Sequence, residues 1–386
     1  MDRRQVWLAL ALLWLAGFGL RLPVLAVPPI LPLMQADLGL TGTHIGILNG
    51  LPVFLFAAAA IPGALLIARV GALNAVIVGL LLAGIAGSLR GFADNLTWLY
   101  LTTVFMGAGI AFMQPAMPAL VRAWTPQRVG FSTALYTNGL LVGEVVPVAL
   151  TVPFILPLVD GSWRGSLVFW GLPMIVIAGL MLFAPRAPAS AALPSRRWWP
   201  DWRDSLIWRL GFILSSVNGV YFCANAFIPG YLTNEGRADL IGITLTALNI
   251  AQLPASAIML MIAGKLERRV WPLVVTGLLM LVSVIGIAFS ASGWTVAWAA
   301  LLGFVGAATL TIGFALPAMV SAPEDVGRVS AGMFTTSYAL AMLTSVVSGA
   351  AWDIAGDPRW AFLPIALSIL PQVLLIGTIR FPANKT

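Results

Sequence analysis

Two stretches of this chain, GAGIAFMQPAMPALV at 107–121 and GAATLTIGFALPAMV at 306–320, share a Gly-Ala start and a Pro-Ala-x-Val end. Their first residues are 199 positions apart, and two further matches lie at nearly the same separation. The loop PQRVG at 126–130 corresponds to PEDVG at 323–327, and Leu48-Asn49 corresponds to Leu248-Asn249. Three matches at nearly the same separation indicate a chain built from two related halves.

Both halves are too apolar for a soluble protein. The 386 residues are 60% hydrophobic and 9% charged, with a mean hydropathy of +0.96, whereas soluble domains carry about 25% charged residues. The apolar runs exceed the roughly 20 residues that cross a bilayer as a helix and lack the alternation of barrel strands. We therefore predict an all-α membrane protein with twelve transmembrane helices. The predicted spans lie near 5–34, 45–69, 73–92, 96–122, 128–156, 164–184, 205–232, 238–264, 270–291, 293–320, 327–350 and 358–380.

A long polar stretch, FAPRAPASAALPSRRWWPDW at 183–202, lies between the sixth and seventh spans. It predicts an N-terminal six-helix bundle at 1–184, a cytoplasmic linker at 185–204 and a C-terminal six-helix bundle at 205–386. Six helices repeated in one orientation predict a pseudo-twofold axis along the membrane normal and a cavity near the middle of the membrane. An alternating-access transporter uses this symmetry, whereas a pore or an enzyme does not need it.

The net charge of +7 has a topological explanation. With both termini inside, sixteen of the 21 basic residues lie on the inner side and four lie outside, namely Arg90, Arg164, Arg237 and Arg359. This positive-inside bias predicts cytoplasmic termini in the inner membrane of a bacterium. The basic charge therefore does not indicate a nucleic-acid partner.

Two ionisable residues, Arg21 and Glu144, lie deep within predicted spans. Arg21 follows Arg4 by 17 residues and Glu144 follows Arg128 by 16, and both helices leave the cytoplasmic side. At 1.5 Å per residue, each side chain lies about 25 Å from its last cytoplasmic arginine, so the two share one height. Charges inside a membrane usually have a partner or a function.

Two interpretations of these charges stay open at this stage. In the first, Arg21 and Glu144 only neutralise each other as a packing device. In the second, Arg21 faces the cavity and anchors an anionic substrate, because a guanidinium stays charged and presents a planar fork of donors. Glu144 then either holds Arg21 until substrate competes for it or carries a proton.

Other polar residues extend the candidate site. Asn218, Tyr221 and Asn225 share one face of the seventh span. They are interpreted either as substrate contacts or as residues that form hydrogen bonds between helices. Tyr136 lies two turns below Glu144 and is a further candidate, whereas Gln114 beside Pro115 is a possible gate. Prolines 23, 28, 29 and 32 are expected to kink the outer half of the first span.

The remaining chemistry of the sequence indicates no cofactor, no metal and no catalytic residue. A lone cysteine, Cys223, excludes a disulfide framework, and with a lone histidine, His44, it makes a metal cluster improbable. We expect a monomer in the lipid bilayer whose partners are a small-molecule substrate and, as a possible coupling ion, the proton.

Several motifs match a known family in order and spacing. They are GLRLP at 19–23, PILPL at 29–33, DLGL at 37–40, GLPV at 50–53, RVG at 128–130 with LYT at 135–137, and LTVP at 150–153 before Trp163-Arg164. With these motifs the chain resembles the major facilitator superfamily and, within it, the cyanate/nitroimidazole transporter family. The resemblance implies that Arg21 corresponds to the family's first-span arginine and that the first, fourth, seventh and tenth spans line the cavity. The chain departs from the pattern in the loop Ala68-Arg69-Val70-Gly71, with alanine where an aspartate is usual, and at Glu144, where a small residue is expected.

The sequence therefore favours a secondary active transporter that moves a small, anionic organic or cyanate-like solute by alternating access. The alternative is a proton-coupled drug or nitroimidazole exporter in which Glu144 exchanges protons for drug. A membrane-embedded enzyme is disfavoured, because the sequence offers no paired carboxylates and no nucleophile with its base.

Overall fold

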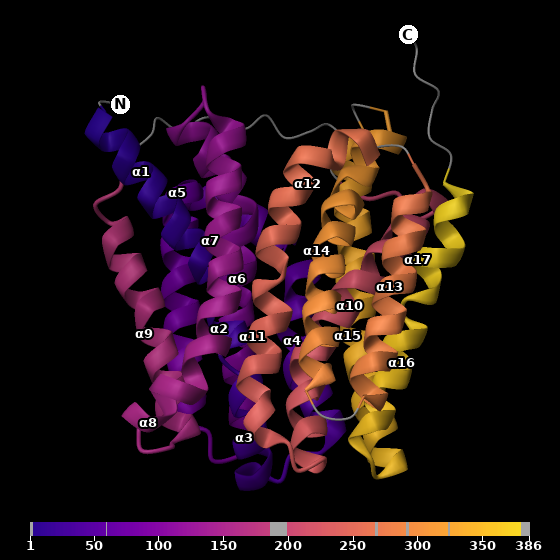
Figure 1. The fold of residues 1–386 in the computed structure, drawn as a ribbon. Helices are drawn as coiled ribbons and strands as arrows, with labels where there is room; N and C mark the ends of the chain where they lie inside the picture. Colours follow the sequence, from indigo (N-terminus) through magenta and orange to yellow (C-terminus); the bar gives the residue numbers. More distant parts are fainter. Residues whose placement is uncertain are drawn as a thin grey trace. The chain divides into compact units, whose positions relative to one another are not determined.

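The computed structural model describes residues 3–58, 60–185, 199–266, 269–290, 293–322 and 325–379, and every regular element among them is helical (Figure 1). The first half contains α1 (Arg3–Gly19), α2 (Leu22–Leu25), η1 (Pro28–Ile30), α3 (Leu31–Leu38), α4 (Gly42–Ala58), α5 (Ala60–Leu89), η2 (Arg90–Phe92), α6 (Leu96–Trp124), α7 (Val129–Leu150), η3 (Thr151–Ile155), α8 (Leu156–Leu158) and α9 (Trp163–Met181). The second half contains α10 (Ser205–Asn234), η4 (Ala238–Leu240), α11 (Ile241–Ile250), α12 (Gln252–Leu266), α13 (Trp271–Phe289), α14 (Trp294–Val320), α15 (Val326–Ala355), η5 (Pro358–Ala361), α16 (Phe362–Leu367), α17 (Leu370–Leu375) and η6 (Ile376–Thr378).

The helices have the length and composition of membrane spans. In the described residues, eleven helical segments are long and apolar enough to cross a bilayer, and the shorter apolar helix α4 completes the set of twelve. The prediction of an all-α membrane fold with twelve spans is confirmed. The repeat is visible as well, because α14 begins about 200 residues after α6 and each helix contains the proline of the shared motif, Pro118 or Pro317.

The second and third spans are joined by a very short connection. Helix α5 contains one residue with non-helical backbone angles, Gly71, at φ 83° and ψ 160°. Positive φ is strained for residues with a Cβ and open to glycine. Gly71 therefore separates the two helical parts of α5, in the loop that begins at Ala68.

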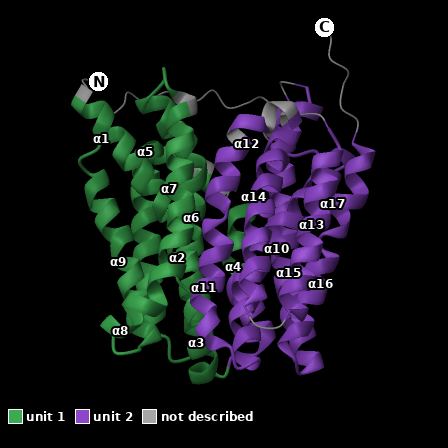
Figure 2. Ribbon diagram, viewed as in Figure 1, with its two compact units in different colours: residues 1–39, 51–193 green, residues 40–50, 194–386 purple. Residues whose placement is uncertain are grey.

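The chain forms two compact units (Figure 2). Unit 1 contains residues 1–39 and 51–193, and unit 2 contains residues 40–50 and 194–386. The boundaries predicted at 184 and 205 stay a prediction, because residues 186–198 of the linker lie outside the described residues. The unexpected feature is α4, whose first nine residues belong to unit 2 while its remainder belongs to unit 1.

Unit 1 is built on two sets of packed helices. Helix α5 packs against α6 and α9, and the broken first span packs against α7 through both α1 and α2. Large apolar side chains on the outer faces, such as Phe105 and Val176, are exposed. Exposed apolar faces of this kind suit lipid as the surrounding solvent.

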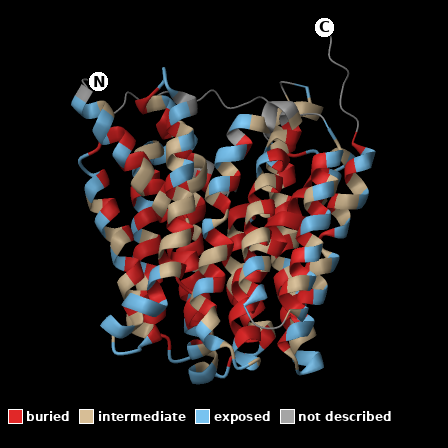
Figure 3. Cartoon of the chain, in the orientation of Figure 1, coloured by how far each residue is buried: buried red, intermediate tan, exposed pale blue. Residues whose placement is uncertain are grey.

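Unit 2 is organised around α10. This helix packs against α15, α14 and α17. The apolar stretch of α10 is 89% buried, whereas that of α15 is 28% buried. Figure 3 marks the buried residues in red. Its buried face carries polar groups, among them Asn218 and Asn225. A helix that is both central and polar is the natural place for interhelical hydrogen bonds within the unit.

The first turns of α4 pack closely against α15. The carboxylate of Asp353 accepts hydrogen bonds from the backbone amides of Gly42, at 2.6 Å, and Thr43, at 2.8 Å. A Cβ added at Gly42 would lie 2.7 Å from the carbonyl oxygen of Gly349, so the two backbones are in direct contact. A carboxylate at a helix N-terminus is favourable, because it meets both the unpaired amides and the positive end of the helix dipole.

Candidate functional site

The first span breaks at Arg21. Helix α1 ends at Gly19 and α2 begins at Leu22, because Pro23 has no amide hydrogen for the carbonyl of Gly19 and its ring would clash with that group. Arg21 adopts φ −121° and ψ −24° in the turn between the two helices. The expectation that prolines interrupt this span is confirmed, and the break between α1 and α2 contains Arg21.

Arg21 and Glu144 form an ion pair. The Nε atom of Arg21 lies 3.3 Å from Oε1 of Glu144, and their side chains are 12% and 5% exposed. The guanidinium also lies over the ring of Phe56, 5.2 Å from its centroid. The sequence predicted equal heights for the two charges and left their direct pairing open; the structure brings them together.

Close packing of α1 on α7 brings the two charges into contact. A Cβ added at Gly143 would lie 3.0 Å from the carbonyl carbon of Phe18, and one at Gly139 would lie 3.1 Å from that of Trp14. Both distances are shorter than the roughly 3.5–4.0 Å of normal carbon contacts. The indole of Trp14 also donates to Oδ1 of Asn138, at 3.0 Å. Glycines on α7 therefore allow the approach that the ion pair requires.

A second arginine, Arg90, supports the break. It is 2% exposed, and its Nη2 donates to the carbonyl oxygen of Pro23 at 2.7 Å. Val27, which would donate to this carbonyl in a regular helix, instead bonds to the carbonyl of Val24. The guanidinium replaces a backbone donor that the broken helix cannot supply. We missed this role because the sequence placed Arg90 among the outer loop residues.

Two other candidates from the first half lie on neighbouring helices of unit 1. Tyr136 is partly buried on α7, two turns before Glu144, and its backbone carbonyl packs against Gly17 of α1. Gln114 is partly buried on α6, beside Pro115. The contacts of Tyr136 place it at the same α1–α7 interface as the ion pair.

The polar residues of α10 form hydrogen bonds within unit 2. Asn218 donates to the hydroxyl of Ser337 on α15, at 2.8 Å. The hydroxyl of Tyr221 donates to Oδ1 of Asn249 on α11, at 2.7 Å, and Asn249 donates to Oδ1 of Asn225, at 2.9 Å. Asn218 and Asn225 are 6% and 1% exposed, whereas Tyr221 is partly exposed. Tyr221 is thus the member of the predicted trio with surface left for a solute.

Asn249 is the residue that joins this network, and we did not include it among the site candidates. It is 1% exposed. Besides the two bonds above, its amide donates to the carbonyl of Leu245, at 2.8 Å. The repeat contained a signal for it, because Asn249 matches Asn49, which itself donates to Ser345 of α15 at 3.1 Å. Asn249 orients Tyr221 and Asn225.

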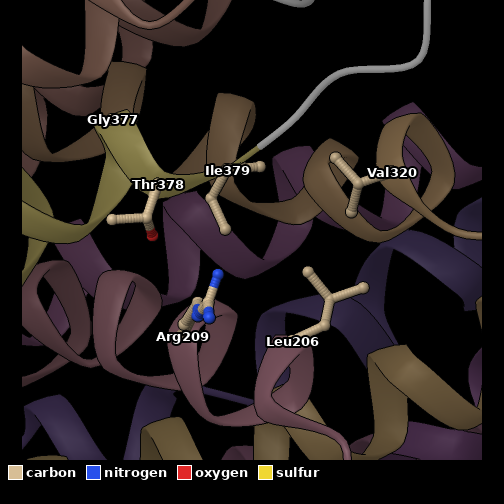
Figure 4. Close-up of a pocket in the computed structure, with 6 residues that line it drawn as sticks. All are labelled: Leu206, Arg209, Val320, Gly377, Thr378 and Ile379. Carbon is tan, nitrogen blue, oxygen red and sulfur yellow. The ribbon is translucent and has the colours of Figure 1, made fainter.

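A separate pocket of about 630 Å³ lies at the end of unit 2 where α10 begins (Figure 4). Its lining residues are Leu206, Arg209, Val320, Gly377, Thr378 and Ile379. None of these residues was a candidate from the sequence. Across the described residues, there is no group of three or more His, Cys, Asp or Glu side chains that could hold a metal ion.

The sequence profile of the Major Facilitator Superfamily matches residues 13–236, which is more than half of the chain. The chain belongs to the major facilitator superfamily. This match includes the broken first span, the ion pair and the polar face of α10. The members of this superfamily that resemble the chain are transporters and not enzymes.

Two relatives in this superfamily come from Escherichia coli. The cyanate transport protein CynX is 26% identical over 384 residues, covering 97% of this chain and 98% of the relative. The 2-nitroimidazole transporter is 25% identical over 370 residues, covering 92% of this chain and 91% of the relative. The expected resemblance to cyanate and nitroimidazole transporters is confirmed, and the chain is a multi-pass membrane transporter of a small molecule.

Solved structures of superfamily transporters share the fold. A bacterial homologue of the human lysosomal transporter Spinster matches with a TM-score of 0.74 at 14% identity, covering 98% of this chain and 96% of that one. The nucleoside transporter NupG also matches with a TM-score of 0.74, at 13% identity. At these identities the likeness concerns the fold alone.

Proposed function

We propose that this chain is a secondary active transporter that moves a small, anionic organic or cyanate-like solute by alternating access. Arg21 anchors the anion, and Glu144 is the group that the anion displaces. The observation that carries the proposal is the buried ion pair at the break of the first span. The cyanate transport protein among the relatives adds support for a small anion.

The location of Arg21 suits an anion anchor. Because α1 ends before it and α2 begins after it, its side chain leaves a turn and not a continuous helix. Its surroundings exclude most water, which strengthens any charge interaction made there. A guanidinium also presents two donors in one plane to the oxygens of a carboxylate, which a compact ammonium cannot do, and it stays charged for any small anion.

In this proposal, Glu144 couples the binding of substrate to the uptake of a proton. Breaking a buried pair by removing one partner costs about 3–5 kcal/mol, because the remaining charge is left uncompensated. A bound anion supplies the missing charge to Arg21, and Glu144 is then stabilised by taking up a proton. In this scheme the transporter moves the anion together with a proton, which is our proposal for the coupling ion.

The remaining candidates take secondary roles. Tyr221, held by Asn249, offers its ring and hydroxyl to the solute, and the buried Asn218 and Asn225 shape that face. Tyr136 lines the region below Glu144, and Gln114 beside its proline is a gate residue of α6. We further propose a monomer with both termini on the cytoplasmic side of a bacterial inner membrane, from the distribution of basic residues.

A binding assay on purified protein tests the anchor. Cyanate, thiocyanate and small carboxylates are titrated against the native protein and the variants Arg21→Ala, Arg21→Lys and Arg122→Ala. Arg122 is an exposed arginine in the last turn of α6 and controls for the loss of one positive charge. We expect Arg21→Ala to weaken anion binding at least tenfold, Arg21→Lys to retain part of it, and Arg122→Ala to change little. Unchanged anion affinity in Arg21→Ala would exclude the anchor.

Glu144→Gln tests the coupling. Without the competing carboxylate we expect tighter anion binding at neutral pH and an anion affinity that no longer depends on pH, both measured in the binding assay. We also expect the anion to move without a proton, which a pH-sensitive dye inside proteoliposomes measures. If Glu144→Gln leaves proton movement intact, Glu144 is not the proton carrier.

A proton-coupled exporter of drugs or nitroimidazoles is the second candidate, favoured by the 2-nitroimidazole transporter and by a mycobacterial efflux pump that is 27% identical over 287 residues. Retained transport of neutral nitroaromatics by Arg21→Ala, with transport lost in Glu144→Gln, would establish this alternative.

A further inference from the structure

The pocket at the beginning of α10 has the chemistry of an amphipathic anion site. Its cation is Arg209, its walls are the apolar side chains of Leu206, Val320 and Ile379, and Thr378 lies at the rim. Figure 4 shows the guanidinium of Arg209 directed toward Thr378 and Ile379. A volume of about 630 Å³ is that of a small-molecule site, and it is much larger than a single inorganic anion needs.

The charge of Arg209 is not balanced by the acidic residues of this end of the unit. Asp204 caps α10, where its Oδ1 accepts from the amide of Leu206 at 2.9 Å. Asp201 lies 3.8 Å from the guanidinium of Arg328, which also pairs with Asp325 at 3.0 Å. Among the described residues, no acidic group forms an ion pair with Arg209. The pocket therefore presents a positive charge to its occupant.

The depth of Arg209 fits the boundary between lipid tails and water. It lies four residues after the first residue of α10, or about 6 Å along the helix axis. Its neighbour Trp208 is 43% exposed, donates to the backbone of Trp202 at 2.9 Å and packs on that indole. Tryptophan side chains gather at the membrane interface, so the guanidinium lies at the height of lipid head groups.

We propose that this pocket binds the phosphate head group of an anionic membrane lipid, with Arg209 as its charge partner and the apolar walls in contact with the glycerol and upper acyl carbons. Basic pockets between membrane helices are known to hold acidic head groups. The hydroxyl of Thr378 donates to the carbonyl of Leu375 at 2.7 Å, so recognition of the charge rests on Arg209. This site is independent of the anion anchor at Arg21.

A thermal-shift experiment on delipidated protein in neutral detergent tests the proposal. Dioleoyl phosphatidylglycerol, dioleoyl phosphatidylcholine and inorganic phosphate are added in separate arms to the native protein and to Arg209→Gln. We expect phosphatidylglycerol to raise the melting temperature of the native protein by about 2 °C or more. We expect the shift to be lost in Arg209→Gln and to be much smaller with phosphatidylcholine.

Two further variants make the result specific. Arg203→Gln removes an exposed arginine of the same segment that does not line the pocket, and it should keep the full lipid shift. Gly377→Leu retains Arg209 and fills the pocket, because a Cβ at Gly377 meets nothing within 4 Å, and it should lose the shift.

Three outcomes would overturn the proposal: an equal lipid shift in the native protein and in a normally folded Arg209→Gln, an equal shift with phosphatidylcholine, or an Arg209-dependent shift with phosphate alone. The last result would identify a site for a free anion. If Arg209→Gln fails to fold, the Gly377→Leu arm decides.

Discussion

Replacing Gly143 by alanine tests whether helix packing sets the geometry of the ion pair. A Cβ at this position would lie 3.0 Å and 3.1 Å from the carbonyl carbon and Cα of Phe18, and closer still to the carbonyl oxygen. Normal contact requires about 3.5–4.0 Å, so α1 and α7 must move apart by several tenths of an ångström up to about 1 Å. Because Glu144 is the next residue, the 3.3 Å approach of Arg21 to Glu144 lengthens with them.

Overpacking of this kind costs about 1–3 kcal/mol, and we expect weaker anion binding in addition to lower stability. The matched control is Gly179→Ala on α9, where an added Cβ meets nothing within 4 Å; it should be neutral or slightly stabilising, since alanine favours helix. Stability is measured by thermal unfolding in detergent with tryptophan fluorescence as the readout, and anion binding is measured by titration. If Gly143→Ala melts and binds like Gly179→Ala, close packing of α1 on α7 does not hold the pair.

Three further changes test hydrogen bonds at the break of the first span, beside α10 and at the start of α4. Arg90→Met leaves the carbonyl of Pro23 without its donor, and a loss of about 1–3 kcal/mol should accompany faster amide exchange at the helix break; unchanged exchange would refute the supporting role. Asn249→Leu leaves the Tyr221 hydroxyl without its acceptor and should destabilise the protein by a similar amount, measured by thermal unfolding. Asp353→Asn removes a charge from the N-terminus of α4 and should cost about 0.3–1 kcal/mol, visible as reduced protection of the first amides of that helix.

The fold could be predicted from the sequence because the lipid bilayer allows an apolar segment of sufficient length to cross it only as a helix. Apolar length is sufficient to define a span, since lipid leaves the backbone no partner except itself. The repeat then identified two related halves without any knowledge of contacts. The height of Arg21 and Glu144 followed from the rise per residue of a helix. What could not follow was their direct pairing, because the angular position of a side chain depends on how α1 and α7 pack.

The residues that we missed are those whose roles depend on burial and not on sequence position. Arg90 directly follows an apolar run. The positive-inside rule counts arginines in loops, and it does not distinguish a buried guanidinium from an exposed one. Asn249 was visible only as a partner of Asn49 in the repeat. The start of α4 is hydrogen-bonded to Asp353, a residue about 310 positions away in the chain, and no local pattern indicates such a contact.

In our proposal, the buried charges of unit 1 favour an anionic substrate over a neutral one. Among the described residues, Arg90 and Glu144 are the charged side chains that are almost fully buried, at 2% and 3% exposure, and Arg21 is nearly so. Two positive charges and one negative charge leave this interior with a net charge of +1. Arg90 is held by the carbonyl of Pro23 and forms no ion pair among the described residues. In our proposal an anion binds as Glu144 takes up a proton, so the net charge of +1 does not change while Arg21 exchanges one negative partner for another. A neutral drug supplies no negative charge, so proton uptake by Glu144 would raise the net charge of this interior.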